Sequence, residues 1–261
     1  MSDYTKHING IDISINDEGQ GEILILVHGL NGYKESMYPV RNFMKSNYHV
    51  ITYDARGHGH SEMVPRYTLD DHAEDLIALA MEYGKGGKVR VWGFSMGSYI
   101  ALAALLKAPE VFEKVILMGT KGDGKTSSVE RILGEKGIKM SDIDQKQLTK
   151  YLMDATFAPK TGLLKKLGVL RYRKNIPLTE AQKKAQTDAL HNFDQFPDMP
   201  KITTPVMVLA GEYDGINPPE LGKAVADAIP GAKYVLVKDA AHMMACEQPK
   251  FVRQAALDFL Q

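Results

Sequence analysis

The sequence predicts an α/β protein with an open, mostly parallel central sheet. Six short runs are mostly hydrophobic and not regularly alternating, which is typical of strands buried on both faces of a parallel sheet. Segments with apolar residues at helical spacing separate these runs, and the alternation of strands with helices favours this fold class. One long segment near the middle of the chain interrupts the alternation.

The elements follow in chain order. An alternating stretch around Asn9 and Gly10 predicts an antiparallel starting hairpin, because Asn-Gly favours a tight two-residue turn. The predicted parallel strands are residues 23–29, 49–54, 88–93, 114–119, 205–211 and 233–238. The helices predicted to cover them are residues 69–83, 98–107, 218–228 and 249–260.

Residues 121–192 contain helical patterns and no strand-like run. The helices predicted there are residues 129–136, 144–157, 162–170 and 179–191. We therefore expect a core domain built from residues 1–120 and 193–261, with residues 121–192 inserted as an all-helical cap. Residues 121–190 carry 15 Lys and Arg against 8 Asp and Glu, a net charge of +7. Either a solvated surface or an attraction for acidic substrates accounts for this charge.

The composition narrows the classes of partner. The chain has 261 residues, 44% of them hydrophobic, and a formal net charge of +0, so we expect a sizeable core and no nucleic-acid partner. We expect no membrane segment, because the apolar runs are far shorter than the roughly 20 residues that span a bilayer. The first residues contain no signal-like apolar run, which favours a cytoplasmic protein. One cysteine excludes an internal disulfide, and the oligomeric state is left open.

Ser95 lies between Gly93 and Gly97, where a predicted strand meets a predicted helix. The pattern G-x-S-x-G in this setting predicts a nucleophile elbow, a sharp turn that exposes the serine oxygen. The two glycines remove side chains that would collide across the turn. The first amides of the helix point at the group that the oxygen attacks. Ser95 is therefore the candidate nucleophile.

A serine hydroxyl needs a base, and the chain offers eight histidines. His242 follows a short predicted strand, so its loop should emerge at the same edge of the sheet as Ser95. We interpret His28 as fixing its own loop. His58 and His60 lack a third ligand at metal-site spacing, so we expect no metal and no cofactor. The other histidines belong to no evident constellation: His7, His49, His72 and His191.

The candidate acid is Asp214, in a turn rich in Gly, Asn and Pro after the fifth predicted strand. Taken alone, Asp214 also fits a turn or helix-capping role. The chain order Ser95, Asp214, His242 favours the catalytic role, because it is the order expected after a nucleophile elbow of this type. Glu212 and Asp239 are close rivals for the same role.

Two backbone amides complete the candidate site. The N–H after the nucleophile belongs to Met96, and a second is assigned to Leu30 in the glycine-containing loop 28–32. Paired donors of this kind stabilise the oxyanion of a tetrahedral intermediate. We also expect the side chains of Met96 and Leu30 to wall the pocket.

Five motifs resemble those of the α/β-hydrolase superfamily. They are HGLNG (28–32), YDARGHGHSE (53–62), GFSMG (93–97), GEYDGINP (211–218) and AAHMMACEQP (240–249). The resemblance covers residues 22–119 and 203–261, whereas the cap matches nothing specific. It implies Ser95 as the nucleophile, His242 as the base and Asp214 as the acid.

The resemblance implies a serine hydrolase that acts on small carboxylic esters through an acyl-enzyme intermediate, with a small-molecule substrate. The superfamily also includes lactonases, carbon–carbon bond hydrolases, cofactor-free haloperoxidases, iminopeptidases and thioesterases, so lactone or diketone hydrolysis is the alternative. A ligand-binding protein with little turnover is the third hypothesis. Apolar cap residues offer surface either to shape the pocket or to pack on the core: Tyr151, Leu152, Phe157, Leu163, Leu164, Leu167 and Leu170.

Overall fold

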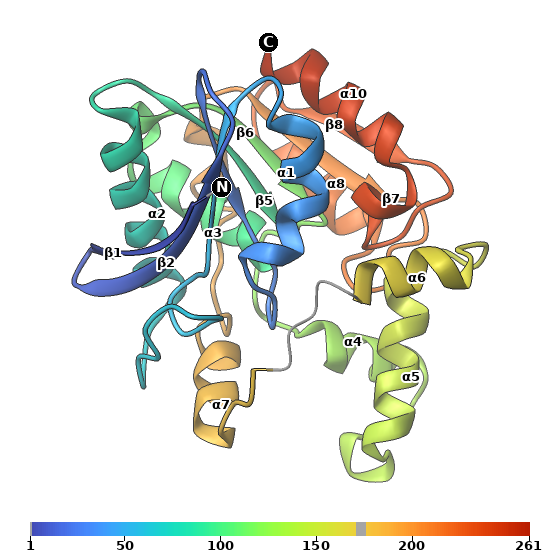
Figure 1. The fold of residues 1–261 in the computed structure, drawn as a ribbon. Coiled ribbons are helices and arrows are strands. Elements are labelled where there is room, and N and C mark those ends of the chain that lie inside the picture. Colours follow the sequence, from blue (N-terminus) through green and yellow to red (C-terminus); the bar gives the residue numbers. More distant parts are fainter. Residues whose placement is uncertain (1, 171–175) are drawn as a thin grey trace.

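The computed structural model describes residues 2–170 and 176–261, and its described part contains an eight-stranded sheet in the order β1-β2-β4-β3-β5-β6-β7-β8 (Figure 1). All neighbours from β4 to β8 are parallel, while β2 pairs antiparallel with both β1 and β4. This confirms the predicted mostly parallel sheet. The strands are β1 (Ser2–Ile8), β2 (Ile11–Glu18), β3 (Ile23–Val27), β4 (His49–Tyr53), β5 (Val89–Phe94), β6 (Phe112–Met118), β7 (Val206–Gly211) and β8 (Lys233–Val237).

The predicted hairpin joins β1 to β2 through Asn9 and Gly10, with Ile8 opposite Ile11. Both turn residues have positive φ, 48° at Asn9 and 79° at Gly10. Such a turn matches the right-handed twist of the paired strands, and Asn and Gly tolerate it best. The hairpin therefore forms where the local sequence predicts it.

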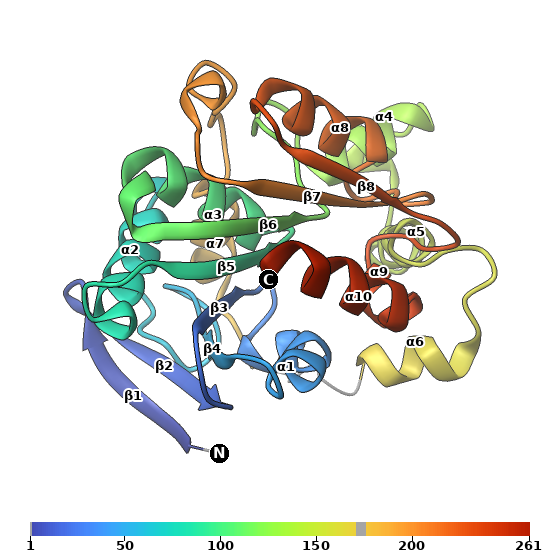
Figure 2. The ribbon, with the colours of Figure 1, turned by 90° about the horizontal axis from the view of Figure 1, so that it is seen from above.

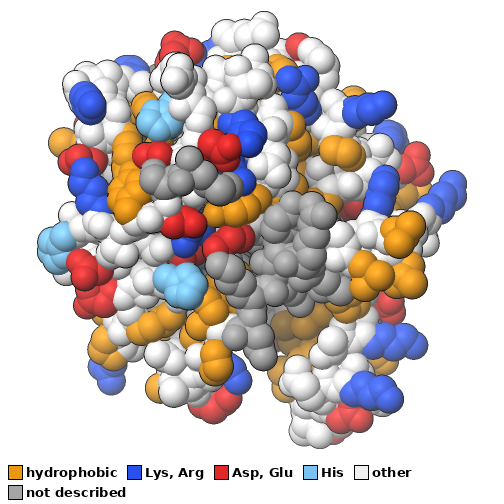
Figure 3. Space-filling model, viewed as in Figure 1, with side chains coloured by type: hydrophobic (Ala, Val, Ile, Leu, Met, Phe, Trp, Pro, Cys, Tyr) orange, Lys and Arg blue, Asp and Glu red, His pale blue; other side chains and the backbone are white. Residues whose placement is uncertain are grey.

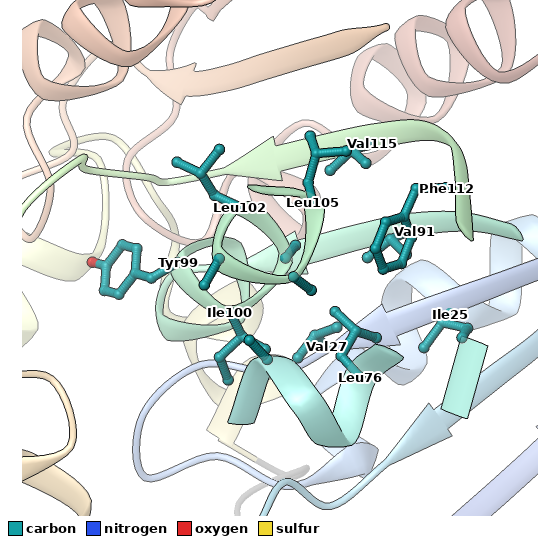
Figure 4. Close-up of a cluster of buried hydrophobic side chains, with 14 of the residues drawn as sticks. Ile25, Val27, Leu76, Val91, Tyr99, Ile100, Leu102, Leu105, Phe112 and Val115 are labelled. Carbon is teal, nitrogen blue, oxygen red and sulfur yellow. The ribbon is translucent and has the colours of Figure 1, made fainter. Parts of the chain in front are cut away.

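Helices cover both faces of the sheet (Figure 2). Successive residues of β3 point to opposite faces, so Ile25 and Val27 join one cluster of buried side chains while Leu24 and Leu26 join the other. Figure 4 shows Ile25 and Val27 in the first cluster, beside residues of α2 and α3. The first face is covered by α2 (Leu69–Gly84), α3 (Met96–Lys107) and α8 (Pro219–Ala228), and the second by α1 (Tyr38–Met44), α9 (Met244–Glu247) and α10 (Pro249–Leu260).

Between β6 and β7 the described residues form helices that lie at one side of the core (Figure 1). A single antiparallel bridge, Asp123 to Asp194, joins the chain where it leaves the core to the chain where it returns. The division into a core domain and a cap remains a prediction. The helices are α4 (Ser128–Glu135), α5 (Gln145–Thr156), α6 (Leu163–Leu170) and α7 (Glu180–Asp188).

The apolar residues of the predicted cap, which were expected either to shape the pocket or to pack on the core, differ widely in exposure. Phe157 is buried, but Leu163, Leu164 and Leu167 are 70%, 86% and 51% exposed. Hydrophobic side chains gather over α6 on the right of Figure 3. The side chain of Leu170 lies outside the described part. Across the described ranges, no helix is both long and apolar enough to cross a membrane.

Candidate active site

Ser95 occupies the turn between β5 and α3 with a φ of 52° and a ψ of −120°. A positive φ is strained for a residue with a side chain and persists only where the surroundings enforce it. The neighbouring glycines allow the turn, because a Cβ at Gly93 would lie 2.2 Å from the Gly97 carbonyl oxygen. A Cβ at Gly97 would lie 2.1 Å from the Val27 carbonyl oxygen. The backbone here excludes other residues at both glycine positions.

Asp214 and His242 lie in contact, although 28 residues separate them in the chain. Oδ2 of Asp214 is 2.8 Å from Nδ1 of His242, and both side chains are buried. The other oxygen, Oδ1, accepts the backbone N–H groups of Ile216 and Asn217 at 2.8 and 2.9 Å. A carboxylate that accepts these bonds needs a donor at Oδ2, so Nδ1 carries the proton and Nε2 is left as the basic nitrogen.

The imidazole of His242 is held between two residues beside the elbow. The ring of Phe94, the residue before Ser95, lies 4.8 Å from it between centroids. On another side, a Cβ at Gly119, where φ is 62°, would lie 3.0 Å from Cε1 of His242, so a larger residue there would press on the ring. Ser95 and His242 thus come from neighbouring parts of the same sheet edge.

The loop after β3 lies against Ser95, since a Cβ at Gly29 would be 3.2 Å from the Ser95 Cβ. His28 fixes this loop: its Nε2 accepts the Ala55 N–H at 3.0 Å, so its Nδ1–H donates to the Gly29 carbonyl at 2.8 Å. Burial lowers the pKa of His28, which keeps the ring neutral. Leu30 follows in this loop.

Met96 is the first residue of α3 and is fully buried. Its N–H belongs to the first turn of the helix, where backbone donors lack intrahelical partners. Met96 therefore follows Ser95 at the start of a helix, whereas Leu30 lies in the loop whose Gly29 packs against Ser95.

The other two candidate acids, Glu212 and Asp239, do not take the position of Asp214 beside His242. Glu212 bonds Lys238 at 2.7 Å and accepts the Asp239 N–H at 3.0 Å. The bond from Lys238 lowers the pKa of Glu212. Among these three acids the structure places Asp214 alone against the His242 ring.

A buried polar network lies behind the site, and no pattern in the sequence indicated it. The Asn217 side-chain amide donates to the Tyr99 hydroxyl and to the Gly119 carbonyl, both at 2.6 Å. Its backbone N–H holds Asp214, so one residue links the acid turn to α3. Burial raises the pKa of Tyr99, and the phenol stays neutral. Figure 4 shows Tyr99 at the end of the apolar cluster with its oxygen directed away from it.

We expected His72 to lie apart from other functional side chains, but its ring packs against another buried histidine. The rings of His28 and His58 are 5.3 Å apart, and those of His58 and His72 are 6.0 Å apart. All three are buried beside the loop that carries Leu30. Within the described residues, no group of three His, Cys, Asp or Glu side chains is arranged to hold a metal ion.

The groups at this sheet edge suit hydrolysis by a nucleophilic serine. They are a hydroxyl on a strained turn, a buried imidazole–carboxylate pair and the amides of a helix N-terminus. Comparison with known proteins defines the class further. A family model described as alpha/beta hydrolase fold matches residues 22–158, and one described as TAP-like protein matches residues 180–261. The chain belongs to the α/β-hydrolase family and is a hydrolase of this fold.

Individual relatives span nearly the whole chain. The “Putative non-heme bromoperoxidase BpoC” of Mycobacterium tuberculosis is 26% identical, over 95% of this chain and 97% of its own length. The 2-hydroxy-6-oxononadienedioate/2-hydroxy-6-oxononatrienedioate hydrolase of Escherichia coli is 25% identical, over 95% and 90%. The solved structure of a thermophilic esterase from Thermogutta terrifontis matches with a TM-score of 0.80 and 25% identity, over 100% and 98%.

Proposed function

We propose that the protein is a serine hydrolase that acts on small carboxylic esters. One observation carries the proposal: the strained Ser95 turn and the His242–Asp214 bond of 2.8 Å lie at the same edge of the sheet. The similarity to a solved esterase over the whole chain supports the choice of substrate class.

In each half-reaction His242 acts first as a base and then as an acid. Nε2 of His242 takes the proton from the Ser95 hydroxyl as Oγ attacks the ester carbonyl carbon. The amides of Leu30 and Met96 hold the oxyanion that forms. His242 then gives its proton to the leaving alcohol, and the acyl group stays on Ser95. Water, deprotonated by the same imidazole, attacks the acyl carbon. The bond from that carbon to Ser95 Oγ then breaks, His242 returns its proton to Oγ, and the acid is released.

Asp214 orients the base and stabilises its charged form. Two backbone N–H groups hold Oδ1, so Oδ2 remains directed at Nδ1 of His242. This arrangement keeps the proton on Nδ1 and the lone pair on Nε2, the tautomer that the reaction requires.

The test uses p-nitrophenyl acetate and butyrate with the wild type and Ser95→Ala. We expect the wild type to hydrolyse both esters and the variant to lose about 10⁴-fold or more in kcat. Intact-mass analysis with a fluorophosphonate should show one adduct on the wild type and none on Ser95→Ala. If the wild type neither reacts with the fluorophosphonate nor hydrolyses the esters, the assignment as a serine hydrolase is wrong. A ligand-binding protein would then be favoured.

A second candidate is hydrolysis of a lactone or of a carbon–carbon bond in a diketone. The similarity to the E. coli dienedioate hydrolase favours it, because that name describes a doubly anionic substrate and this cap is basic. Labelling by fluorophosphonate without ester turnover, followed by turnover of a lactone or an anionic diketone, would select this candidate. Faster turnover of neutral than of anionic esters would assign the basic charge to a solvated surface.

A further inference from the structure

A short stretch of the cap lies against both loops that carry the candidate acid and base. Residues 155–161, which join α5 to α6, are named the strap here. At the end of α5, the carbonyl of Ala155 accepts the Gly215 N–H at 2.9 Å, and that of Thr156 accepts the Met243 N–H at 3.4 Å. The last carbonyls of a helix lack partners within it. Here the partners come from the residues that directly follow Asp214 and His242.

Glu247 forms the third link. Its Oε1 accepts the Ala158 N–H at 2.8 Å and the hydroxyl hydrogen of Thr161, while its Oε2 accepts the Ala241 N–H at 2.7 Å. Ala241 directly precedes His242. The side chain is buried, with 2% of the residue exposed. One carboxylate thus holds the strap and the histidine loop together.

The chemistry of this link requires a carboxylate. Both of its oxygens only accept hydrogen bonds, and backbone N–H groups approach Glu247 from both sides. The amide of a glutamine would present its NH₂ group to one of these donors and leave that side unbonded. A shorter aspartate would not span the same two partners.

The strap and the acid loop also meet closely. A Cβ at Gly215 would lie 2.8 Å from both Cα and Cβ of Ala155, so a glycine is needed for the contact. Lys165, in the first turn of α6, donates to the Glu247 carbonyl at 2.8 Å. The contact is therefore built from backbone, side-chain and charged groups.

We propose that the strap, through Glu247, positions the Asp214–His242 pair for the reaction. This inference rests on the proposed function. The bonds reach residues 215, 241 and 243, which flank the acid on one side and the base on both. A shift of the strap moves these residues, and misplacing a base by about 1 Å costs about 10²-fold in rate. Glu247 is a positioning residue, because it acts on the base through the Ala241 N–H and on the strap through the Ala158 N–H.

The test loosens the strap without touching the candidate triad. Thr161→Val removes one donor to Glu247 and keeps the side-chain shape, while Thr161→Ser keeps the hydroxyl. Thr149→Val is the matched control, because this exposed hydroxyl on α5 donates to the Gln145 carbonyl of its own helix and to no other group in the described part of the chain. We expect Thr161→Val to lower kcat and the rate constant for fluorophosphonate labelling about three- to tenfold, with KM within about twofold. Thr161→Ser and Thr149→Val should match the wild type.

A second readout follows the base directly. The hydrogen-bonded Nδ1 proton of His242 gives a low-field NMR resonance, and Glu247→Gln should shift or broaden it at a temperature where the variant is folded. If Thr161→Val and Glu247→Gln lower only the melting temperature, and labelling, kcat and the resonance stay unchanged, the strap is merely structural and the inference fails. If the wild type does not label, the proposed function fails, and the resonance still decides whether the strap positions the pair.

Discussion

The buried histidines beside the loop of Leu30 predict that the protein loses stability between about pH 8 and pH 5. Burial lowers the pKa of His28 and of His72, and lowers the pKa of His58 to about 3. Nε2 of His58 and Nε2 of His72 are buried, and neither has a hydrogen-bond partner among the residues that the structure describes. The folded rings therefore stay neutral at a pH where the same rings bind protons in the unfolded chain.

The sign and the magnitude follow from linkage. An unfolded histidine titrates near pH ~6.5, so between that value and about pH 3 the unfolded His58 is charged while the folded ring is neutral. The contribution of His58 to the free energy of unfolding consequently falls as the pH falls through this window, and that contribution does not change above it. At pH 5, about 1.5 units below the unfolded pKa, His58 alone lowers it by about 2 kcal/mol. His28 and His72 act in the same direction.

The assay is urea unfolding at pH 8 and pH 5 of the wild type, His58→Asn and His60→Asn. An asparagine at position 58 can keep the 2.9 Å bond that Nδ1–H of His58 donates to the Arg56 carbonyl. His60 is exposed and two residues away, so the same substitution there is the control. We expect His58→Asn to lose about 2 kcal/mol less than the wild type between the two pH values. Equal losses in all three proteins would refute the reasoning.

Two further predictions concern close packing and a buried ion pair. Gly119→Ala puts a Cβ 3.0 Å from Cε1 of His242 at a φ of 62°, so we expect ester hydrolysis to fall about tenfold or more, and an unchanged kcat would contradict the geometry. Arg56→Ala removes two bonds of 2.9 and 2.7 Å from the buried Asp75 carboxylate and should cost about 3–5 kcal/mol in urea unfolding. Lys6→Ala breaks an exposed ion pair and should cost less than about 1 kcal/mol, so similar losses in both variants would overturn this ranking.

Local patterns in the sequence located most elements. The predicted strand 88–93 is β5, Val89–Phe94, and the predicted helix 249–260 is α10, Pro249–Leu260. The spacing of apolar residues reflects burial of the strand on both faces and of the helix on one. A short stretch of sequence is enough to show such spacing. No such pattern predicted α1, Tyr38–Met44, which is short and begins next to a proline. The helix predicted at 179–191 is shorter in the structure, Glu180–Asp188.

Part of the candidate site, too, could be predicted from the sequence, and part of it could not. Ser95, Asp214 and His242 each follow a parallel strand, and the carboxyl ends of parallel strands meet at one edge, so their proximity could be predicted from the sequence. The motif predicted Asp214 with Glu212 as a close rival, and the structure places Asp214 against His242 while Glu212 bonds Lys238. Each acid lies in the same turn, and only the direction of its side chain separates them.

What the sequence by itself determined was the sheet, its covering helices and the edge where the candidate groups gather, because short-range periodicity and glycine spacing encode them. Tertiary structure alone decided the links between distant segments. The Glu247 carboxylate meets the Ala158 N–H across 89 residues, and the Gln186 amide meets the Gly57 carbonyl across 129. Such bonds depend on how complete elements pack, and no local pattern records which buried donor a carboxylate will face.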